Sequence, residues 1–130
     1  MKRCFADTNF YLRFILQDNK TQANLVEEEL KRAKAGQIQI IFLSIVILEM
    51  GFVLKSFYSI PNVQITTHLS TLIKTSFLEV QDRSVWLKVL PVFAKKNIDL
   101  IDIFLFEKAI SEDGTVLSFD KDLERLKKLG

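Results

Sequence analysis

Cysteine, histidine, proline and glycine are all scarce in this chain of 130 residues. The sequence contains one Cys, one His, two Pro and four Gly. A single thiol, Cys4, cannot form an internal disulfide and fits a buried strand in a reducing compartment. No cysteine or histidine spacing indicates a zinc site. The low glycine and proline content also argues against a flexible or low-complexity protein.

Long stretches of one charge are missing as well. The formal net charge is +2 and no run rich in Lys or Arg exists, so charge alone does not indicate a nucleic-acid partner. One apolar run, residues 38–54, is shorter than the roughly 20 residues of a membrane-spanning helix and contains Glu49. We interpret it as a buried strand followed by a buried helix. Because no signal peptide is visible either, these patterns predict a cytoplasmic protein that does not cross a membrane.

Apolar residues are abundant, and they indicate one compact core. They make up 48% of the chain and include 11 Phe. The length suits a single domain over residues 1–130. Apolar segments that alternate with helical patterns predict an α/β domain with a mostly parallel sheet. We expect strands at residues 3–7, 37–43, 77–80 and 115–119, and helices at residues 9–17, 21–35, 44–56, 62–75, 83–96, 99–112 and 121–129.

Four carboxylates lie inside or beside apolar sequence, at the end of a strand or in a helix that could pack near one. They are Asp7, Glu49, Asp102 and Asp120. Since parallel sheets bind ligands at the carboxyl ends of their strands, the fold could bring these acids to one edge. Clustered carboxylates repel one another and persist through shared protons or a hard cation. Carboxylate oxygens favour Mg²⁺ or Mn²⁺, and such ions can activate water at a phosphodiester.

Each acid also has a local structural interpretation. Asp7 and Asp120 are good N-cap residues for the helices that follow them, and Asp102 could form a capping-box-like pair with Asp99. Glu49 differs, because apolar residues flank it on both sides and no basic residue lies within helical reach before it. We therefore expect Glu49 to lie in the core, with a basic residue, a shared proton or a metal ion as its partner.

The acids and their neighbours resemble a known family. Asp-Thr-Asn after the first strand, Glu in an apolar helix, IDLIDIFLFEKA and LSFDKDLERL resemble PIN-domain ribonucleases, and among them the VapC-type toxins of prokaryotic toxin–antitoxin pairs. The resemblance implies a three-layer α/β/α fold with a mostly parallel central sheet. It also implies an endoribonuclease in which Mg²⁺ or Mn²⁺ activates water to attack RNA. Its partners would be RNA, a cognate antitoxin protein and a second copy in a homodimer.

The resemblance assigns roles to individual residues. The catalytic, metal-holding acids would be Asp7, Glu49, Asp102 and Asp120. Thr8 and Asn9 would orient the first of these acids, and Ser118 matches a Ser or Thr often found two positions before the last. Because the last acid belongs to an Asp-Lys-Asp motif, Asp120 and Asp122 could share or exchange the role of fourth metal ligand.

Two other functions stay open at this point. A catalytically inactive PIN-like module could bind RNA or protein, and it would show no saturable binding of Mn²⁺. A different Mg²⁺ enzyme or signalling domain is the third possibility. It fits less well, because Asp-Thr-Asn stands where aspartate-nucleophile phosphatases have Asp-x-Asp, and the second strand ends in Phe-Leu-Ser rather than in an acid.

Overall fold

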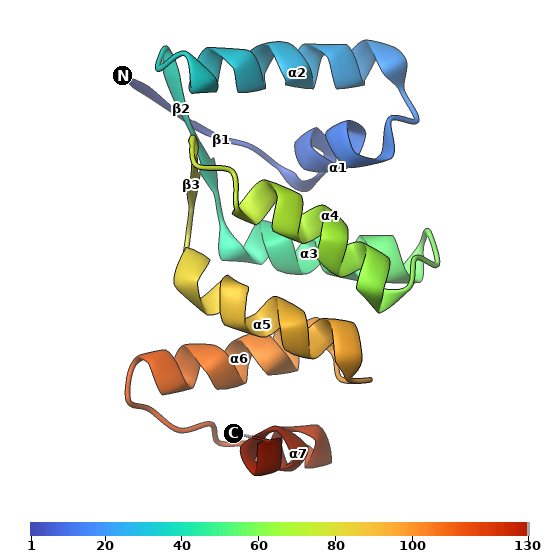
Figure 1. Cartoon of the computed structure of the whole chain (residues 1–130), viewed down its shortest axis with the longest axis vertical. Helices are drawn as coiled ribbons and strands as arrows, with labels where there is room; N and C mark the ends of the chain where they lie inside the picture. The colour runs from blue at the N-terminus through green and yellow to red at the C-terminus, as the bar shows by residue number, and fades with distance from the viewer. Residues whose placement is uncertain (130) are drawn as a thin grey trace.

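A parallel sheet forms the centre of the protein. A computed structural model describes residues 1–129, and in them three strands pair in the order β1-β2-β3 (Figure 1). The strands are β1 (Lys2–Phe5), β2 (Ile38–Phe42) and β3 (Leu78–Val80). The central strand β2 is the most buried, as its Ile- and Phe-rich sequence predicts. Pairing of β1 with β2 runs from Lys2 opposite Ile38 to Phe5 opposite Ile41, so β1 is an edge strand.

Helices accompany the sheet and complete a three-layer α/β/α fold. In the described residues they are α1 (Thr8–Leu16), α2 (Lys20–Lys34), α3 (Ser44–Ser56), α4 (Asn62–Ile73), α5 (Arg83–Lys95), α6 (Leu100–Ser111) and α7 (Lys121–Leu129). Helix α2 packs against β2, and α4 packs against β3. Helices α5, α6 and α7 follow one another toward the end of the molecule opposite α2 (Figure 1). Among the residues described, no helix combines the length and apolar character needed to cross a membrane.

Aromatic contacts join the helices to the core. Tyr11 of α1 stacks on Phe42 of β2 with ring centroids 4.0 Å apart, and its hydroxyl donates a hydrogen bond of 3.3 Å to a β2 backbone carbonyl. Burial raises the pKa of Tyr11, which therefore stays neutral. Trp86 of α5 stacks on Phe104 of α6 at 4.5 Å, and its indole N–H donates to Ser44 Oγ at 2.9 Å. These contacts fix α1 on the sheet and α5 on α6.

Helices α3 and α6 approach each other closely at a glycine. Gly51 is buried in α3, and a Cβ atom at this position would lie 2.6 Å from Leu100 Cδ2. A larger residue would force the Leu100 side chain to move, because two atoms cannot overlap at this distance. The contact therefore fixes the first turn of α6, which carries Asp102, against α3.

The connection from α4 to β3 is held by one arginine. Arg83 Nε donates to the carbonyl oxygen of Ile73 at 2.8 Å, and Arg83 Nη2 donates to those of Thr75 and Leu78 at 2.8 and 2.6 Å. The bond to Ile73 satisfies a carbonyl group at the C-terminal end of α4 that has no intrahelical partner, and the other two bonds hold the connection and the first residue of β3. They also fix the beginning of α5, whose first residue is Arg83.

Residues 115–119, expected to form a strand, lie outside the sheet. The segment contains no helix or strand, and Leu117 and Phe119 are 94% and 107% exposed. The cause is positional, because the segment joins α6 to α7, and these helices lie at the end of the molecule away from β1 (Figure 1). The prediction of a fourth strand within this chain is therefore wrong for this conformation.

Candidate functional site

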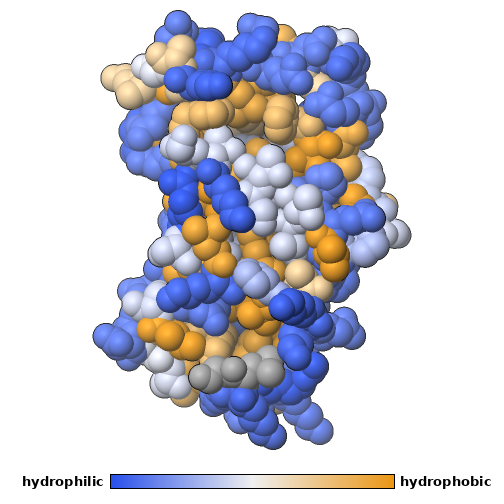
Figure 2. Space-filling view, in the orientation of Figure 1, coloured by the Kyte–Doolittle hydropathy of each residue, from blue (hydrophilic) through white to orange (hydrophobic). Residues whose placement is uncertain are grey.

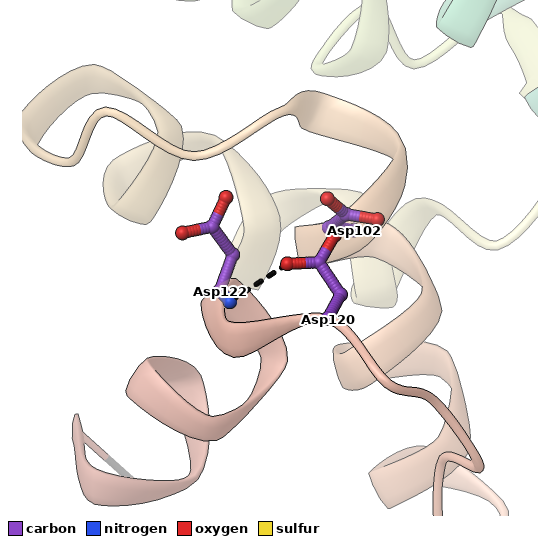
Figure 3. A group of neighbouring side chains, drawn as sticks. All are labelled: Asp102, Asp120 and Asp122. Atoms are coloured by element: carbon purple, nitrogen blue, oxygen red, sulfur yellow. Dashed lines mark hydrogen bonds between the residues drawn. The ribbon is translucent and has the colours of Figure 1, made fainter.

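Three of the acidic side chains singled out in the sequence meet in one cluster. Asp102, Asp120 and Asp122 each offer a carboxylate oxygen, and these oxygens all lie within 4.8 Å of one another (Figure 3). Asp102 belongs to the first turn of α6, whereas Asp122 belongs to the first turn of α7 and Asp120 directly precedes that helix. The packing of α7 on α6 therefore builds the cluster from two segments that are separate in sequence.

Local hydrogen bonds shape the turn that carries two of these acids. Ser118 Oγ accepts a hydrogen bond of 2.9 Å from the Asp120 backbone N–H. Asp120 Oδ1 in turn accepts one of 2.8 Å from the Asp122 backbone N–H (Figure 3). Such side-chain acceptors satisfy the unpaired N–H groups of a helix beginning. Asp120 therefore acts both as a local cap of α7 and as a member of the acidic cluster, with its other oxygen available to a ligand.

The cluster is electrostatically unfavourable without a positive partner. Burial raises the pKa of the Asp102 carboxyl, and the charges of Asp120, Asp99 and Asp122 raise it further. Among the residues that the structure describes, Asp122 is the member of the cluster that forms a salt bridge, because Arg125 Nη1 lies 3.1 Å from Asp122 Oδ1 on the next turn of α7. A shared proton or a bound cation would offset the repulsion at the Asp102 carboxylate.

The chemistry of this donor set matches a hard divalent cation. Three carboxylates from two segments supply oxygen ligands and negative charge, which Mg²⁺ and Mn²⁺ prefer over the sulfur and nitrogen ligands of softer metals. In the part of the chain that the structure describes, no other group of three or more Asp, Glu, His or Cys side chains comes this close together. The residues present therefore fit Mg²⁺ or Mn²⁺ at the ends of α6 and α7.

Asp7 and its two polar neighbours are placed elsewhere. Asp7 is exposed and caps α1, since its Oδ1 accepts a hydrogen bond of 3.0 Å from the Phe10 backbone N–H. Thr8 is buried and Asn9 is exposed in the first turn of the same helix. None of these residues belongs to the cluster, and β1 and α1 lie away from α6 and α7 in Figure 1. In a single copy of the chain Asp7 is therefore the N-cap of α1, which is the local structural role that its sequence position also suggested.

Glu49 is exposed, which corrects the expectation that it lies in the core. Apolar neighbours in the sequence do not indicate burial here, because Ile45 and Phe52 on the same helix are themselves 71% and 63% exposed. Glu49 lines a hollow of about 640 Å³ between α3 and α6, together with Asp99 of the α6 N-terminus and Lys55. The hollow is otherwise mainly apolar. Glu49 is therefore a member of a second acidic locality beside the cluster and does not belong to the cluster itself.

Asp99 and Lys108 make interactions around α6 that the sequence did not predict. Asp99 makes no side-chain capping bond, lines the hollow with Glu49 and raises the pKa of Asp102. Its spacing of three residues from Asp102 was the available signal, because such residues share a helix face. Lys108 forms ion pairs with Asp82 at 3.0 Å and with Glu112 at 2.8 Å. The pair with Asp82 ties α6 to the start of α5, whereas Glu112 lies at the end of α6 itself. No sequence pattern marked Lys108.

Comparison with known proteins gives one match. The sequence model of the PIN domain family matches residues 4–129, nearly the whole chain. A search of curated proteins and a search of solved structures each returned no match.

Proposed function

Because this chain belongs to the PIN-domain family, whose fold is of the nuclease type, we propose that it is a Mg²⁺- or Mn²⁺-dependent endoribonuclease. The observation that carries the proposal is the meeting of Asp102, Asp120 and Asp122 within 4.8 Å. Such a cluster carries a cost, because burial first and then the charges of Asp120, Asp99 and Asp122 raise the pKa of Asp102. A role in binding a divalent cation and a phosphodiester accounts for that cost.

Each side chain of the cluster has a distinct part in this proposal. Asp102 and Asp120 would hold the cation, and Asp122 would support it while remaining paired with Arg125. Ser118 would fix the backbone at Asp120 and so keep the carboxylate turned toward Asp102. When bound, the cation would supply Lewis acidity at the phosphoryl oxygen and a more acidic water molecule. The protein would supply the position of the ligands and the exclusion of softer metals.

The proposal extends to a toxin that is held in check by an antitoxin. The hollow between α3 and α6 supports this extension, because it is mainly apolar and carries Glu49 and Asp99. An amphipathic helix of a partner protein could place apolar side chains there and direct a basic side chain toward the acids. RNA as substrate, the antitoxin and a homodimer are parts of the same proposal.

Cleavage of a single-stranded RNA by the purified protein tests the proposal. We expect cleavage with Mn²⁺ or Mg²⁺, none with excess chelator, and none with the Asp102→Asn variant. Asp113→Asn is the matched control, because Asp113 is exposed, lies outside the cluster and has a positive φ of 55° that asparagine tolerates. Equal cleavage by wild type and Asp102→Asn would refute the assignment of the site.

A binding module without catalysis is the second candidate, and one observation favours it. Asp7 is engaged as a helix cap and Glu49 points into a different hollow, so a single copy gathers only part of the expected acids. A module of this kind would bind RNA or protein without cutting it. It is the better description if Mn²⁺ binds without saturation and RNA remains intact in the presence of the purified protein.

A further inference from the structure

The outer edge of β1 is an unused hydrogen-bonding surface. In the described part of the chain β1 pairs with β2 alone, so the N–H and C=O groups of its other edge have no strand partner. Phe5 on this strand is 59% exposed, with the Arg3 guanidinium 5.4 Å from its ring centre. An open edge strand with an exposed aromatic side chain is a template for another extended chain.

The segment 115–119 has the complementary properties. Its sequence, Thr-Val-Leu-Ser-Phe, is rich in residues that favour strands. Within residues 1–129 its backbone makes no hydrogen bond to other backbone groups, and Leu117 and Phe119 are almost completely exposed. Two large apolar side chains in water and a row of unpaired backbone groups are both relieved when such a segment joins a sheet edge.

One copy of the chain keeps these two parts away from each other. Helix α7 is docked on α6 through Leu123 and Leu126, which are 3% and 2% exposed, so the segment is anchored at both of its ends. That anchor lies at the end of the molecule remote from β1 (Figure 1). We propose that residues 115–119 of one copy pair in parallel with β1 of a second copy, and reciprocally, which gives a dimer with two-fold symmetry.

The register of this pairing has a consequence for the acids. Asp7 follows Lys2 by five residues, and Asp120 follows Thr115 by five residues. Parallel pairing of Thr115 with Lys2 therefore places Asp120 of one copy beside Asp7 of the other. Asp102 and Asp122 accompany Asp120, because all three form one cluster. Asp7 and the cluster, which lie apart in one copy, then meet between two copies. The role of this shared site in catalysis rests on the proposed nuclease function, whereas the strand exchange does not.

A disulfide cross-link tests the exchange directly. In the same register position 117 lies beside Cys4 of the other copy, within the Cα separation of neighbouring strands that a disulfide can span. We expect the Leu117→Cys variant, oxidised as an equal mixture of ¹⁵N-labelled and unlabelled protein, to form a covalent dimer in which peptides containing positions 4 and 117 come from different copies. Leu25→Cys is the matched control, since Leu25 is an exposed leucine of α2. A link within one chain, or no link between these positions, would overturn the proposal.

Complementation between two inactive variants tests the shared site. The Asp7→Asn and Asp120→Asn chains are expected to be inactive alone, but a heterodimer with exchanged segments contains one site in which both acids are intact. Random co-assembly during co-expression should therefore restore about a quarter of the wild-type cleavage rate. If the mixture is inactive but the cross-link forms, the shared site is refuted and the strand exchange is supported. If the wild-type protein itself does not cleave RNA, the nuclease proposal fails, and the cross-link alone decides the exchange.

Discussion

Two parts of this protein have the same local design and different surroundings. In one, β1 leads through Asp7 into α1, and in the other, residues 115–119 lead through Asp120 into α7. Both aspartates accept a hydrogen bond from a backbone N–H of the helix that follows, at 3.0 Å for Asp7 and 2.8 Å for Asp120. The first segment is paired in the sheet, whereas the second is unpaired and exposed. Local sequence therefore determines the cap in both places, and tertiary contacts alone determine which segment becomes a strand.

The largest expected effect is on the rate of RNA cleavage when Asp7 or Asp120 loses its charge. Asparagine remains a good helix cap, so Asp120→Asn and Asp7→Asn remove charge while preserving each cap. We expect Asp120→Asn to reduce RNA cleavage by about 100- to 1000-fold, since a charged group at the reaction centre is lost. Asp7→Asn should cause a loss of similar size if the exchanged dimer forms the site. Initial rates of cleavage with Mn²⁺ measure both, and an unchanged rate for Asp120→Asn would contradict the role of the cluster.

The helices that follow the two aspartates should respond differently to cavities. Leu12 of α1 and Leu126 of α7 are each 2% exposed. Leu12→Ala should lower the global free energy of unfolding by about 2–5 kcal/mol, because α1 packs on the central strand. Leu126→Ala should instead free α7 locally, since α7 contacts α6 at the end of the molecule. Denaturant unfolding measures the first change and amide hydrogen exchange the second; global destabilisation by Leu126→Ala would show that α7 belongs to the cooperative core.

The two caps themselves can be compared by removing the accepting oxygen. Asp7→Ala should cost about 1 kcal/mol of unfolding free energy through the lost bond to the Phe10 N–H. Asp7→Asn should cost much less. Thermal unfolding of both variants without divalent cation provides the measurement. Equal destabilisation by the two substitutions would mean that the charge of Asp7, and not its cap, stabilises the fold.

The smallest expected effect is a gain in stability at Asp102. The pKa of its carboxyl is raised in the folded protein, first by burial and then by Asp120, Asp99 and Asp122. Because the ionised form is therefore less favourable in the folded than in the unfolded state, this charge lowers stability above its folded pKa, and the penalty disappears as the pH falls below the unfolded value. Asp102→Asn should slightly raise the melting temperature at neutral pH without divalent cation. A lowered melting temperature would show that Asp102 makes stabilising contacts in its charged form.

The sequence predicted the elements better than their arrangement. In residues 1–129 the helices α1 to α7 begin and end within two residues of the expected positions, and so do β1, β2 and β3. Capping residues and apolar periodicity act over a few neighbouring residues, which explains this success. The segment 115–119 has strand-favouring residues, but its pairing depends on where α6 and α7 dock, and no local pattern contains that information.

The candidate site was predictable only in part. Of the four acids expected to meet, Asp102 and Asp120 do so in one copy of the chain, joined by Asp122, and Ser118 contacts the Asp120 backbone. The burial of Glu49 was predicted wrongly, because an apolar sequence around a residue does not reveal that α3 exposes that face to the hollow beside α6. Asp7 caps α1 in a single copy of the chain, and its meeting with the other acids is a consequence of the strand exchange that we propose.

Titration with Mn²⁺, followed by the loss of the free-ion electron paramagnetic resonance signal, addresses the acidic cluster most directly. Wild-type protein should bind Mn²⁺ saturably, whereas Asp102→Asn should bind it much more weakly and Asp113→Asn should match wild type. Non-saturating binding by wild type, or equal binding by the Asp102→Asn variant, would contradict the assignment of Asp102, Asp120 and Asp122 as a cation site.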